Sequence, residues 1–367
     1  MLDLDFWKQR RVFLTGHTGF KGGWLATWLL KLGARVTGYA LKPETDPSFF
    51  TLCGLEKRME SVIGDIREEE SLGRAMERFR PEVVFHLAAQ SLVRRSYRNP
   101  VQTFATNLMG TVHLLEAVRR TPSVLAAVVV TSDKCYENRE WMRGYREEDP
   151  VGGHDPYSAS KGCAELAAAA YRRSFFTNDG SPGSIATARA GNVIGGGDWA
   201  EDRLVPDAIR AVHRGEPLIV RNPGALRPWQ HVLEPVAGYL MLAERLYKQG
   251  GKWAGAWNFG PREEDVVTVG SLSDMLVKRW GNATWKAAPE ADAPHEARCL
   301  KLDSSQARQT LGWQPRLTLS ETVEMTVDWY RKALSWAPDD GLYEMTCDQI
   351  NGYEERAPSR IKQGSVS

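Results

Sequence analysis

The sequence predicts an α/β fold, in which a doubly wound parallel sheet is followed by a smaller mixed lobe. In the first half, short apolar runs alternate with longer amphipathic stretches, which is the pattern of repeated βαβ units. The runs are nearly continuous in Val, Ile and Ala, as in strands that are covered on both faces. After about residue 190 the composition changes, and Gly, Pro, Trp and Arg become frequent. These observations favour a Rossmann-type sheet domain with a C-terminal lobe built from loops and short strands.

The individual elements follow from the same patterns. Apolar runs predict strands at 11–15, 34–41, 61–65, 82–88, 125–131 and 183–190. Helical periodicity predicts helices at 22–33, 67–79, 102–120, 157–177, 236–250 and 269–281. The segment 302–315 has Asp303 or Ser304 as a plausible helix N-cap and Gly312 at its far end. The expected division is a sheet domain over 1–190 with a later segment at about 229–260 returning to it, a lobe over 191–340 and an irregular tail over 341–367.

The composition argues against several classes of function. The 367 residues carry a net charge of +1, so no overall field attracts nucleic acid or an anionic membrane surface. No apolar run approaches the length of a membrane span, and the N-terminus does not resemble a signal peptide. The five cysteines are scattered without a CxxC pair, which favours reduced thiols in a cytoplasmic protein. No His or Cys spacing indicates a metal site.

A glycine-rich turn, TGHTGFKGGW, lies between the first predicted strand and the first predicted helix. Gly16, Gly19 and Gly22 permit a tight turn and a close approach of the backbone to a pyrophosphate, which the positive end of the helix attracts. A nicotinamide dinucleotide is therefore the expected cofactor. Lys21, inside the turn, either adds charge to a phosphate or is a solvated lysine on the first helical turn.

The residues after the second strand leave the choice between NAD and NADP open. An acidic residue about twenty positions after the glycines binds the adenosine ribose of NAD. This place holds Leu41 or Lys42, with Glu44 and Asp46 slightly beyond. Asp65, after the third strand, is a candidate for a contact with adenine, and its alternative role is the N-cap of the following helix.

Tyr157 and Lys161 lie four residues apart in DPYSASKGCAE, at the start of a predicted helix, and therefore share one face. A lysine ammonium beside a phenol favours the phenolate and lowers its pKa. Such a tyrosine can take a proton from a sugar hydroxyl while a nicotinamide takes the hydride. A YxxxK pair alone is most often a surface pair, but the glycine turn upstream and the strand end TSDK between them favour a catalytic role.

Together, the glycine turn, TSDK and YxxxK resemble the extended short-chain dehydrogenase/reductase superfamily. Within it, longer strings resemble the CDP-glucose 4,6-dehydratase family: GHTGFKG, TSDKCYEN, PYSASKGCAE, RAGNVIGGGDWA, RPWQHVLEP and NFGPREED. The resemblance runs from Phe6 to about Trp329. It implies a hydro-lyase that binds NAD and converts CDP-glucose to CDP-4-keto-6-deoxyglucose. In that reaction C4 is oxidised, water is lost across C5 and C6, and the same hydride returns to C6.

The resemblance gives the adjacent Asp133 and Lys134 a role in this reaction. The elimination needs a base at C5 and an acid at the C6 hydroxyl, and ligands lie at the carboxyl ends of strands in open α/β sheets. The related dTDP-glucose dehydratases carry Asp–Glu here. We assign Asp133 as the acid and Lys134 as the base; the exchanged assignment stays open, and a local ion pair is the alternative without function. Ser132 would hydrogen-bond the C4 hydroxyl beside Tyr157.

The remaining site residues are also expected from the motifs and the resemblance. The expected cofactor contacts are Gly16, Thr18, Gly19, Phe20, Lys21, Gly22, Asp65, Ile66, Leu87, Ala88, Ala89, Asn107, Thr131, Tyr157 and Lys161. The expected substrate contacts are Gln90, Asn192, Arg221, Arg227, His231 and Arg262. Arginine forks match phosphate oxygens, and the alternative for Arg221 and Arg227 is a surface ion pair. For His17, His86 and His231 a structural role is otherwise favoured.

Three rival functions share parts of this pattern. A nucleotide-sugar 4-epimerase would need Tyr157 and Lys161 but not a C5/C6 acid–base pair such as Asp133–Lys134. A dehydratase for a different nucleotide-hexose is a further alternative. A non-catalytic NAD-sensing module typically lacks the tyrosine or the lysine. The resemblance further implies deoxysugar biosynthesis for bacterial surface polysaccharide, such as the O-antigen of lipopolysaccharide. It also implies a homodimer or dimer of dimers that pairs through the helices at 102–120 and 157–177.

Overall fold

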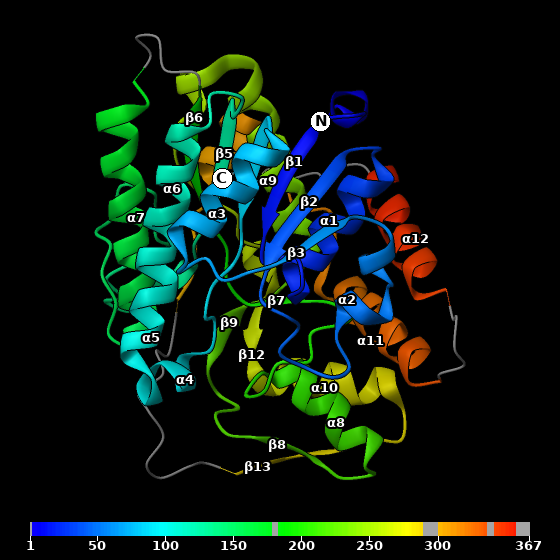
Figure 1. Cartoon of the computed structure of the whole chain (residues 1–367). Helices are drawn as coiled ribbons and strands as arrows, with labels where there is room; N and C mark the ends of the chain where they lie inside the picture. The colour runs from blue at the N-terminus through cyan, green and yellow to red at the C-terminus, as the bar shows by residue number, and fades with distance from the viewer. Residues whose placement is uncertain (1, 178–182, 289–299, 336–340, 357–367) are drawn as a thin grey trace.

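A seven-stranded parallel sheet forms the centre of the molecule, as a computed structural model describes it for residues 2–177, 183–288, 300–335 and 341–356 (Figure 1). The strand order is β11-β6-β5-β4-β1-β2-β3. The strands are β1 (Arg11–Thr15), β2 (Arg35–Ala40), β3 (Glu60–Ile63), β4 (Val83–His86), β5 (Ala126–Val130), β6 (Ser184–Arg189) and β11 (Gly255–Asn258). The order reverses next to β1, which pairs with β2 on one side and with β4 on the other. The six predicted strands and the doubly wound sheet are confirmed.

Helices cover both faces of this sheet (Figure 1). The covering helices are α1 (Phe20–Lys31), α3 (Glu69–Phe79), α6 (Gly110–Arg120), α7 (Pro156–Phe175) and α9 (Leu233–Gln249). Side chains of a strand alternate between faces, so Val12 and Leu14 of β1 join one core and Phe13 joins the other. The first core contains side chains of α1 and α9, and the second contains side chains of α3, α6 and α7. Burial on both faces explains why the strands are apolar throughout.

The helix predicted at 102–120 is interrupted by a π-helical turn. It is composed of α5 (Pro100–Phe104), the π-helix η3 (Ala105–Met109) and α6. The Asn107 amide, within the π turn, donates to the Gln90 carbonyl and to Ser160 Oγ, both at 2.9 Å. Its carbonyl oxygen accepts the Gln90 backbone N–H at 2.8 Å. The π turn therefore faces the segment after β4. Single π turns within α-helices are frequently found at functional sites.

The lobe beside the carboxyl edge of the sheet is made of short elements. Its strand pairs are β7 (Val193–Ile194) with β10 (Gln230–His231), β8 (Leu218–Val220) with β13 (Trp285–Ala287), and β9 (Leu226–Pro228) with β12 (Val266–Thr268). Its helices include α8 (Leu204–His213), α10 (Val269–Trp280) and α11 (Leu319–Leu334). Further short helices are α2 (Phe49–Leu52) and α4 (Val93–Arg98). Gly312 ends a helical turn over Ala307–Leu311 with φ of 74°, which confirms its predicted place.

The expectation of an irregular tail from residue 341 is wrong for its first part. Residues Leu342–Glu355 form the helix α12, which lies against α1 (Figure 1). Its buried residues are Leu342, Thr346, Ile350 and Tyr353, a weak stripe at intervals of three or four positions because one of the four is a threonine. The Glu354 carboxylate accepts from Trp28 Nε1 and Lys31 Nζ, both at 2.7 Å. The last eleven residues of the tail, and Cys299, lie outside the described residues.

Candidate active site

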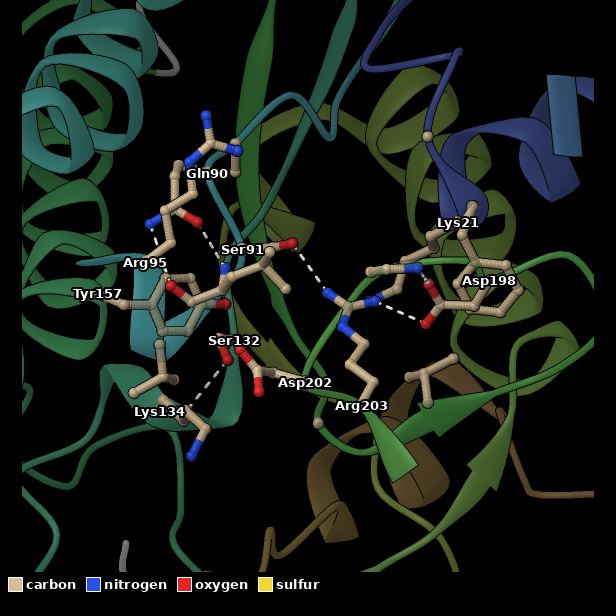
Figure 2. Close-up of a pocket in the computed structure, with 18 of the residues that line it drawn as sticks. Lys21, Gln90, Ser91, Arg95, Ser132, Lys134, Tyr157, Asp198, Asp202 and Arg203 are labelled. Atoms are coloured by element: carbon tan, nitrogen blue, oxygen red, sulfur yellow. Dashed lines mark hydrogen bonds and ion pairs between the residues drawn. The ribbon is translucent and has the colours of Figure 1, made fainter. Parts of the chain in front are cut away.

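A cavity of about 690 Å³ lies at the carboxyl edge of the sheet. Its walls include the residues that directly follow β1, β2, β3, β4, β5 and β6, namely Gly16, Leu41, Gly64, Leu87, Thr131 and Ala190. The opposite wall is formed by the segments at 190–207 and 219–229 of the lobe. Figure 2 shows that Tyr157, Ser132 and Lys134 lie on one side of this cavity, and that Lys21, Asp198 and Arg203 lie on the other. Segments far apart in the sequence thus meet around one space.

The glycine turn after β1 has the geometry of a dinucleotide cradle. Gly16 has φ of 80°, and a Cβ there would lie 2.6 Å from the Ala88 backbone nitrogen. A Cβ on Gly22 would lie 2.0 Å from the Gly16 carbonyl oxygen. Only glycine fits these two positions, and Gly19 forms the N-cap of α1, whose first N–H groups face the turn. The cradle therefore fits a pyrophosphate, and Gly16, Gly19 and Gly22 would hold that part of a nicotinamide dinucleotide.

The ribose end of the cavity contains two acidic residues that are already paired. Glu44 accepts from Arg95 Nη1 at 3.0 Å, and Asp65 accepts from Arg67 Nε at 2.9 Å. Asp65 does not cap the following helix, because the N-cap of α3 is Glu68. Arg67 instead draws the Asp65 carboxylate to itself and lowers the pKa of that group. Leu41 and Lys42 line the cavity beside these two pairs.

The side chains expected to carry the chemistry lie together. Ser132 caps a short 3₁₀ turn, η4 (Asp133–Cys135), that follows β5, and Tyr157 and Lys161 lie on the first turns of α7. The Tyr157 ring and the Ser132 side chain lie on the same side of the cavity (Figure 2). Ser132 Oγ donates to Asp133 Oδ1 at 3.0 Å and accepts the Lys134 backbone N–H at 3.2 Å. All five residues line the cavity.

The protonation of the Tyr–Lys pair differs from the sequence-based expectation. Burial raises the pKa of Tyr157 to about 12, and the hydrogen bond from Ser132 offsets only part of this rise. Burial also lowers the pKa of Lys161 to about 8, although the nearby Glu165 carboxylate opposes the change. The expected lowering of the Tyr157 pKa by Lys161 is therefore wrong for this state of the protein. Desolvation of the buried phenolate is the dominant cause of the raised Tyr157 pKa.

A buried network supports this cluster from behind. Glu165, on the next turn of α7 after Lys161, accepts from Thr187 Oγ1 at 2.7 Å and from Arg189 Nη2 at 2.8 Å. Arg189 Nη1 donates to the Tyr136 hydroxyl at 2.6 Å, and that hydroxyl donates to Asn258 Oδ1 at 2.8 Å. Tyr136 directly follows the η4 turn, so β6 and β11 both hold the segment that carries Asp133 and Lys134.

The lobe side of the cavity is rich in arginine. Arg221, Arg227 and Asn192 line it as expected, and Asn192 has φ of 49°, a conformation that Asn tolerates better than most residues. Arg221 Nη1 donates to Asp202 Oδ1 at 2.8 Å. Sequence reasoning missed Arg203, which donates to Asp198 Oδ2 at 2.7 Å and to Ser91 Oγ at 2.8 Å (Figure 2). Lys21, on the same side of the cavity as Arg203, donates to the Tyr239 hydroxyl at 3.5 Å, and burial lowers the pKa of Lys21 to about 8.

Most other expected contacts also line the cavity, but three do not. Those that do are Thr18, Phe20, Ile66, Ala88, Ala89 and Gln90. His231 is buried between Trp24 and the backbone N–H of Leu233. Arg262 pairs with Asp265 at 2.9 Å, and Asn107 reaches the site only through Gln90 and Ser160. His231 and Arg262 were expected as substrate contacts because they lie in motif-bearing strings, yet the fold directs their side chains into structural contacts.

Gly191 is a second residue that sequence reasoning missed. It follows β6, and a Cβ there would lie 1.8 Å from Asp133 Oδ2. That oxygen is buried and has no hydrogen-bond partner among the described residues. The sequence string AGNVIGGG does not reveal the contact between Gly191 and Asp133. The two segments meet only in the folded sheet, where β5 pairs with β6.

A glycine cradle, a Tyr–Lys pair with an adjacent acid and base, and an arginine-rich far wall define a nicotinamide-dependent enzyme of the nucleotide-sugar-modifying class. The chain belongs to the GDP-mannose 4,6 dehydratase family, whose model matches residues 13–326. It is 52% identical to a CDP-glucose 4,6-dehydratase of Salmonella typhimurium over 96% of this chain and 98% of that protein. It is 27% identical to a dTDP-glucose 4,6-dehydratase of Xanthomonas campestris over 90% and 97% of the two chains.

Solved structures share the fold. The complex of MoeE5 with UDP-glucuronic acid and NAD superimposes with a TM-score of 0.74 at 26% identity, covering 88% of this chain and 99% of that one. A UDP-glucose 4-epimerase of Thermotoga maritima with UDP-glucose gives a TM-score of 0.75 at 24% identity, with the same coverage of both chains. No helix among the described residues is long and apolar enough to cross a membrane.

Proposed function

We propose that the chain catalyses the conversion of CDP-glucose to CDP-4-keto-6-deoxyglucose and water, with NAD as a recycled cofactor. The observation that carries the proposal is the placement of Asp133 and Lys134 beside Tyr157 in one cavity, in a chain 52% identical to a CDP-glucose 4,6-dehydratase along nearly its whole length. An epimerase would have no use for this acid and base. The epimerases among the structural neighbours share the fold at lower identity, which carries no argument about the reaction.

The chain's own residues divide the work as follows. Tyr157 and Ser132 would bind the C4 hydroxyl, and Tyr157 would take its proton. Lys134 would take the C5 proton, and Asp133 would protonate the departing C6 hydroxyl; the exchanged roles of Asp133 and Lys134 remain the alternative. NAD, when bound, supplies the site that accepts the hydride from C4 and returns it to C6. Lys161 would hold the nicotinamide ribose and keep positive charge near Tyr157.

The arginine side of the cavity would hold the CDP diphosphate. Arg203, Arg221 and Arg227 come from three segments of the lobe and all line the cavity. Guanidinium groups form bidentate hydrogen bonds with phosphate oxygens, and in the present structure two of them satisfy these donors with Asp198 and Asp202. An entering diphosphate would compete with those carboxylates. Asn192 would add a hydrogen bond from the backbone turn after β6.

The proposal includes a homodimer or dimer of dimers formed through α6 and α7, in a cytoplasmic enzyme. The support is the exposed apolar side chains on α5 and α7. Val101, on α5, is 82% exposed, and Leu166 and Phe175, on α7, are 57% and 49% exposed. Large exposed apolar side chains are candidates for burial at an interface. The four described cysteines are all free thiols, as in a reducing compartment. The division of the chain at about residues 190 and 340 likewise stays a proposal.

The proposal is tested by mass spectrometry of the purified protein with catalytic NAD and CDP-, dTDP-, GDP- or UDP-hexoses in parallel. We expect loss of one water from CDP-glucose and no change in the others. Isomerisation without a change of mass would instead support an epimerase. Loss of water from a different nucleotide-hexose would retain the reaction and overturn the proposed base. No change with any sugar would overturn the enzyme and leave a binding module.

A further inference from the structure

Asp207 lines the lobe side of the cavity, beyond an arginine that the proposed function, on which this inference rests, assigns to the diphosphate. It lies in the first turn of α8, four residues after Arg203, the N-cap of that helix. The Asp207 backbone N–H donates to the Arg203 carbonyl oxygen at 2.9 Å. One helical turn advances about 5.4 Å, which is comparable to the span of a ribose. With the sugar at Tyr157 and the diphosphate at Arg203, the base of the nucleotide lies beside Asp207.

Arg210 holds the Asp207 carboxylate from outside the cavity. Arg210 Nη1 donates to the Trp199 carbonyl oxygen at 2.9 Å, and Nη2 donates to the Ala200 carbonyl oxygen at 3.1 Å and to Asp207 Oδ1. These bonds fix the guanidinium group, which is not among the residues that line the cavity. Oδ2 of Asp207 accepts no hydrogen bond from the described residues. The carboxylate is therefore oriented through one oxygen, and the other is available to a ligand.

The two other carboxylates on segment 190–207 of the cavity wall are already engaged. Asp198 accepts from Arg203 through Oδ2 at 2.7 Å and from the Ala200 backbone N–H through Oδ1 at 3.2 Å. Asp202 accepts from Arg221 at 2.8 Å. Both partner arginines are those proposed for the diphosphate. Asp207 differs from both, because the arginine that pairs with it faces away from the ligand space.

The surroundings of Asp207 fit a flat ring that carries a hydrogen-bond donor. Burial raises the pKa of Asp207, although Arg210 and Arg221 lower it, so the carboxylate lacks part of the hydrogen bonding that water would supply. Its side chain is still 34% exposed, which leaves it accessible from the cavity. Ile219, which is 46% exposed, lines the same cavity. An apolar wall with a few placed polar groups is the usual setting for a bound ring.

We propose that the Asp207 carboxylate accepts a hydrogen bond from the exocyclic amino group of cytosine and thereby selects CDP-hexoses over UDP- and dTDP-hexoses. An ionised carboxylate can only accept hydrogen bonds. Cytosine presents its N4 amino donor where uracil and thymine present the O4 acceptor. With uracil or thymine, two acceptors would face each other and neither would be satisfied. Asp207 is thus a specificity-determining residue that takes no part in the reaction steps.

Two alternatives make different predictions. If Asp207 only forms an ion pair that orders α8, its loss weakens the binding of every nucleotide equally. Guanine also carries donors that a carboxylate accepts, at N1 and N2. If Asp207 reads guanine, GDP binds more tightly than CDP does.

Calorimetric titration of the enzyme with bound NAD, using CDP, UDP, dTDP and GDP, separates these possibilities without any turnover. We expect the wild type to bind CDP ~10²-fold more tightly than UDP or dTDP, the upper range for reading one base edge. An asparagine amide can accept from N4 or donate to O4. Asp207→Asn should therefore bind CDP ~10-fold more weakly and UDP ~10-fold more tightly. An unchanged ratio of CDP to UDP affinity in Asp207→Asn would overturn the proposal, as would tighter binding of GDP than of CDP.

A ligand analogue tests the same hydrogen bond from the other side and needs no variant of the protein. The diphosphate of 2-pyrimidinone riboside differs from CDP only in having hydrogen in place of the N4 amino group. The wild type should bind it ~10-fold more weakly than CDP, whereas Asp207→Ala should bind the two equally. Equal binding of both by the wild type would show that no protein group reads the amino group.

The controls separate this proposal from folding and from the proposed function. Glu201→Gln is the matched variant, because Glu201 is an exposed acid of the same segment that does not line the cavity. Its nucleotide affinities should stay within about twofold of the wild type, and thermal midpoints of all variants are compared. With CDP-glucose, Asp207→Asn should raise KM ~10-fold and leave kcat nearly unchanged, since it loses uniform binding. If the wild type releases no water from CDP-glucose, the proposed function fails; if it does while Asp207→Asn keeps its selectivity, only the role of Asp207 fails.

Discussion

Each oxygen of the Asp133 carboxylate has its own surroundings. Oδ1 accepts the Ser132 hydroxyl, whereas Oδ2 is buried beside Gly191. A buried acceptor without a partner is costly, and native proteins keep one mainly where a ligand completes it. The contact with Gly191 leaves no room for any side chain on the β6 side, so the carboxylate is held between the two strands that pair there. Its orientation is fixed by a glycine and a serine rather than by a charged partner.

Gly191 should therefore be essential for the dehydration although it has no functional group. Gly191→Ala would place a methyl group 1.8 Å from Asp133 Oδ2, so the carboxylate must turn away and break its bond with Ser132. We expect a ~10²-fold or larger loss of the rate of water release, the range that a displaced general acid costs. The measurement is the steady-state rate with CDP-glucose, together with the thermal midpoint.

The matched control is Gly224→Ala. A Cβ on Gly224 would meet nothing within 4 Å, although the residue lies in the same lobe. Its rate should equal that of the wild type. A Gly191→Ala enzyme that works at full rate would show that the Asp133 side chain can move without loss, which contradicts a fixed acid.

At the scale of elements, α7 carries the chemistry and its support on one face. Tyr157, Lys161 and Glu165 follow each other at one-turn intervals. Glu165 and Arg189 are each 4% exposed, and their ion pair joins α7 to β6 at 2.8 Å. Two further hydroxyl groups, of Thr131 and Thr187, donate to the same carboxylate. The helix is thereby locked to the sheet directly behind the Tyr–Lys pair.

Breaking this ion pair on one side should be more harmful than replacing both partners. Glu165→Gln leaves a buried Arg189 guanidinium without its counter-charge, which typically costs about 3–5 kcal/mol of unfolding free energy. The double variant Glu165→Gln with Arg189→Met removes the stranded charge and should recover at least about 1 kcal/mol of that loss. Urea unfolding of the wild type and the variants measures both values. A double variant less stable than Glu165→Gln would show that the pair contributes mainly through its other hydrogen bonds.

The elements could be predicted from sequence wherever packing repeats a local pattern. β5 and β6 are buried along their entire length, and a continuous apolar run indicates this directly. The π turn at Ala105–Met109 could not be predicted, because its cause is a pair of hydrogen bonds between Asn107 and the Gln90 backbone. The strand β11 and the helix α12 are short or weakly patterned, and each is stabilised by partners far away in the sequence.

The residues of the site also fall into those that the sequence predicts and those that only the fold reveals. Tyr157, Lys161, Ser132 and Asp133 lie within two short strings whose spacing already places them on a helix face and at a strand end. Gly191 and Arg203 become site residues only through tertiary contacts, with Asp133 and with Asp198 and Ser91. The raised pKa of Tyr157 could not be predicted from the sequence, because it depends on the degree of burial, which residue spacing does not provide.

At the scale of the whole molecule, buried ionisable groups couple stability to pH. Burial lowers the pKa of His17 to about 4 and of His86 and His231 to about 3. The unfolded chain binds more protons at these histidines below pH ~6.5, so folding becomes less favourable as pH falls. Burial raises the pKa of Glu234 to about 7. The folded chain binds the extra proton there, so this group favours folding as pH falls from about 7 toward 4.5.

The histidines should dominate this balance. Between pH ~7 and ~5 each histidine costs about 2 kcal/mol and Glu234 returns a similar amount, so the net loss is on the order of 4 kcal/mol. Urea unfolding at the two pH values measures it. Glu234→Gln removes the opposing contribution and should steepen the acid loss. A wild type equally stable at both pH values would show that these histidines also bind protons in the folded chain.

The hydrogen bonds that hold the η4 turn from behind involve residues late in the sequence. Tyr136 is bonded to Asn258, whose amide nitrogen donates to the carbonyl oxygens of Tyr145 and Asp303. During translation, the glycine cradle and the side chains of Ser132, Asp133, Lys134, Tyr157 and Lys161 leave the ribosome more than a hundred residues before Asp303 does. A nascent chain can therefore bind its cofactor before its acid and base are held in place. Catalytic competence arises near the end of synthesis, when the last third of the chain returns to hold a turn formed in the first half.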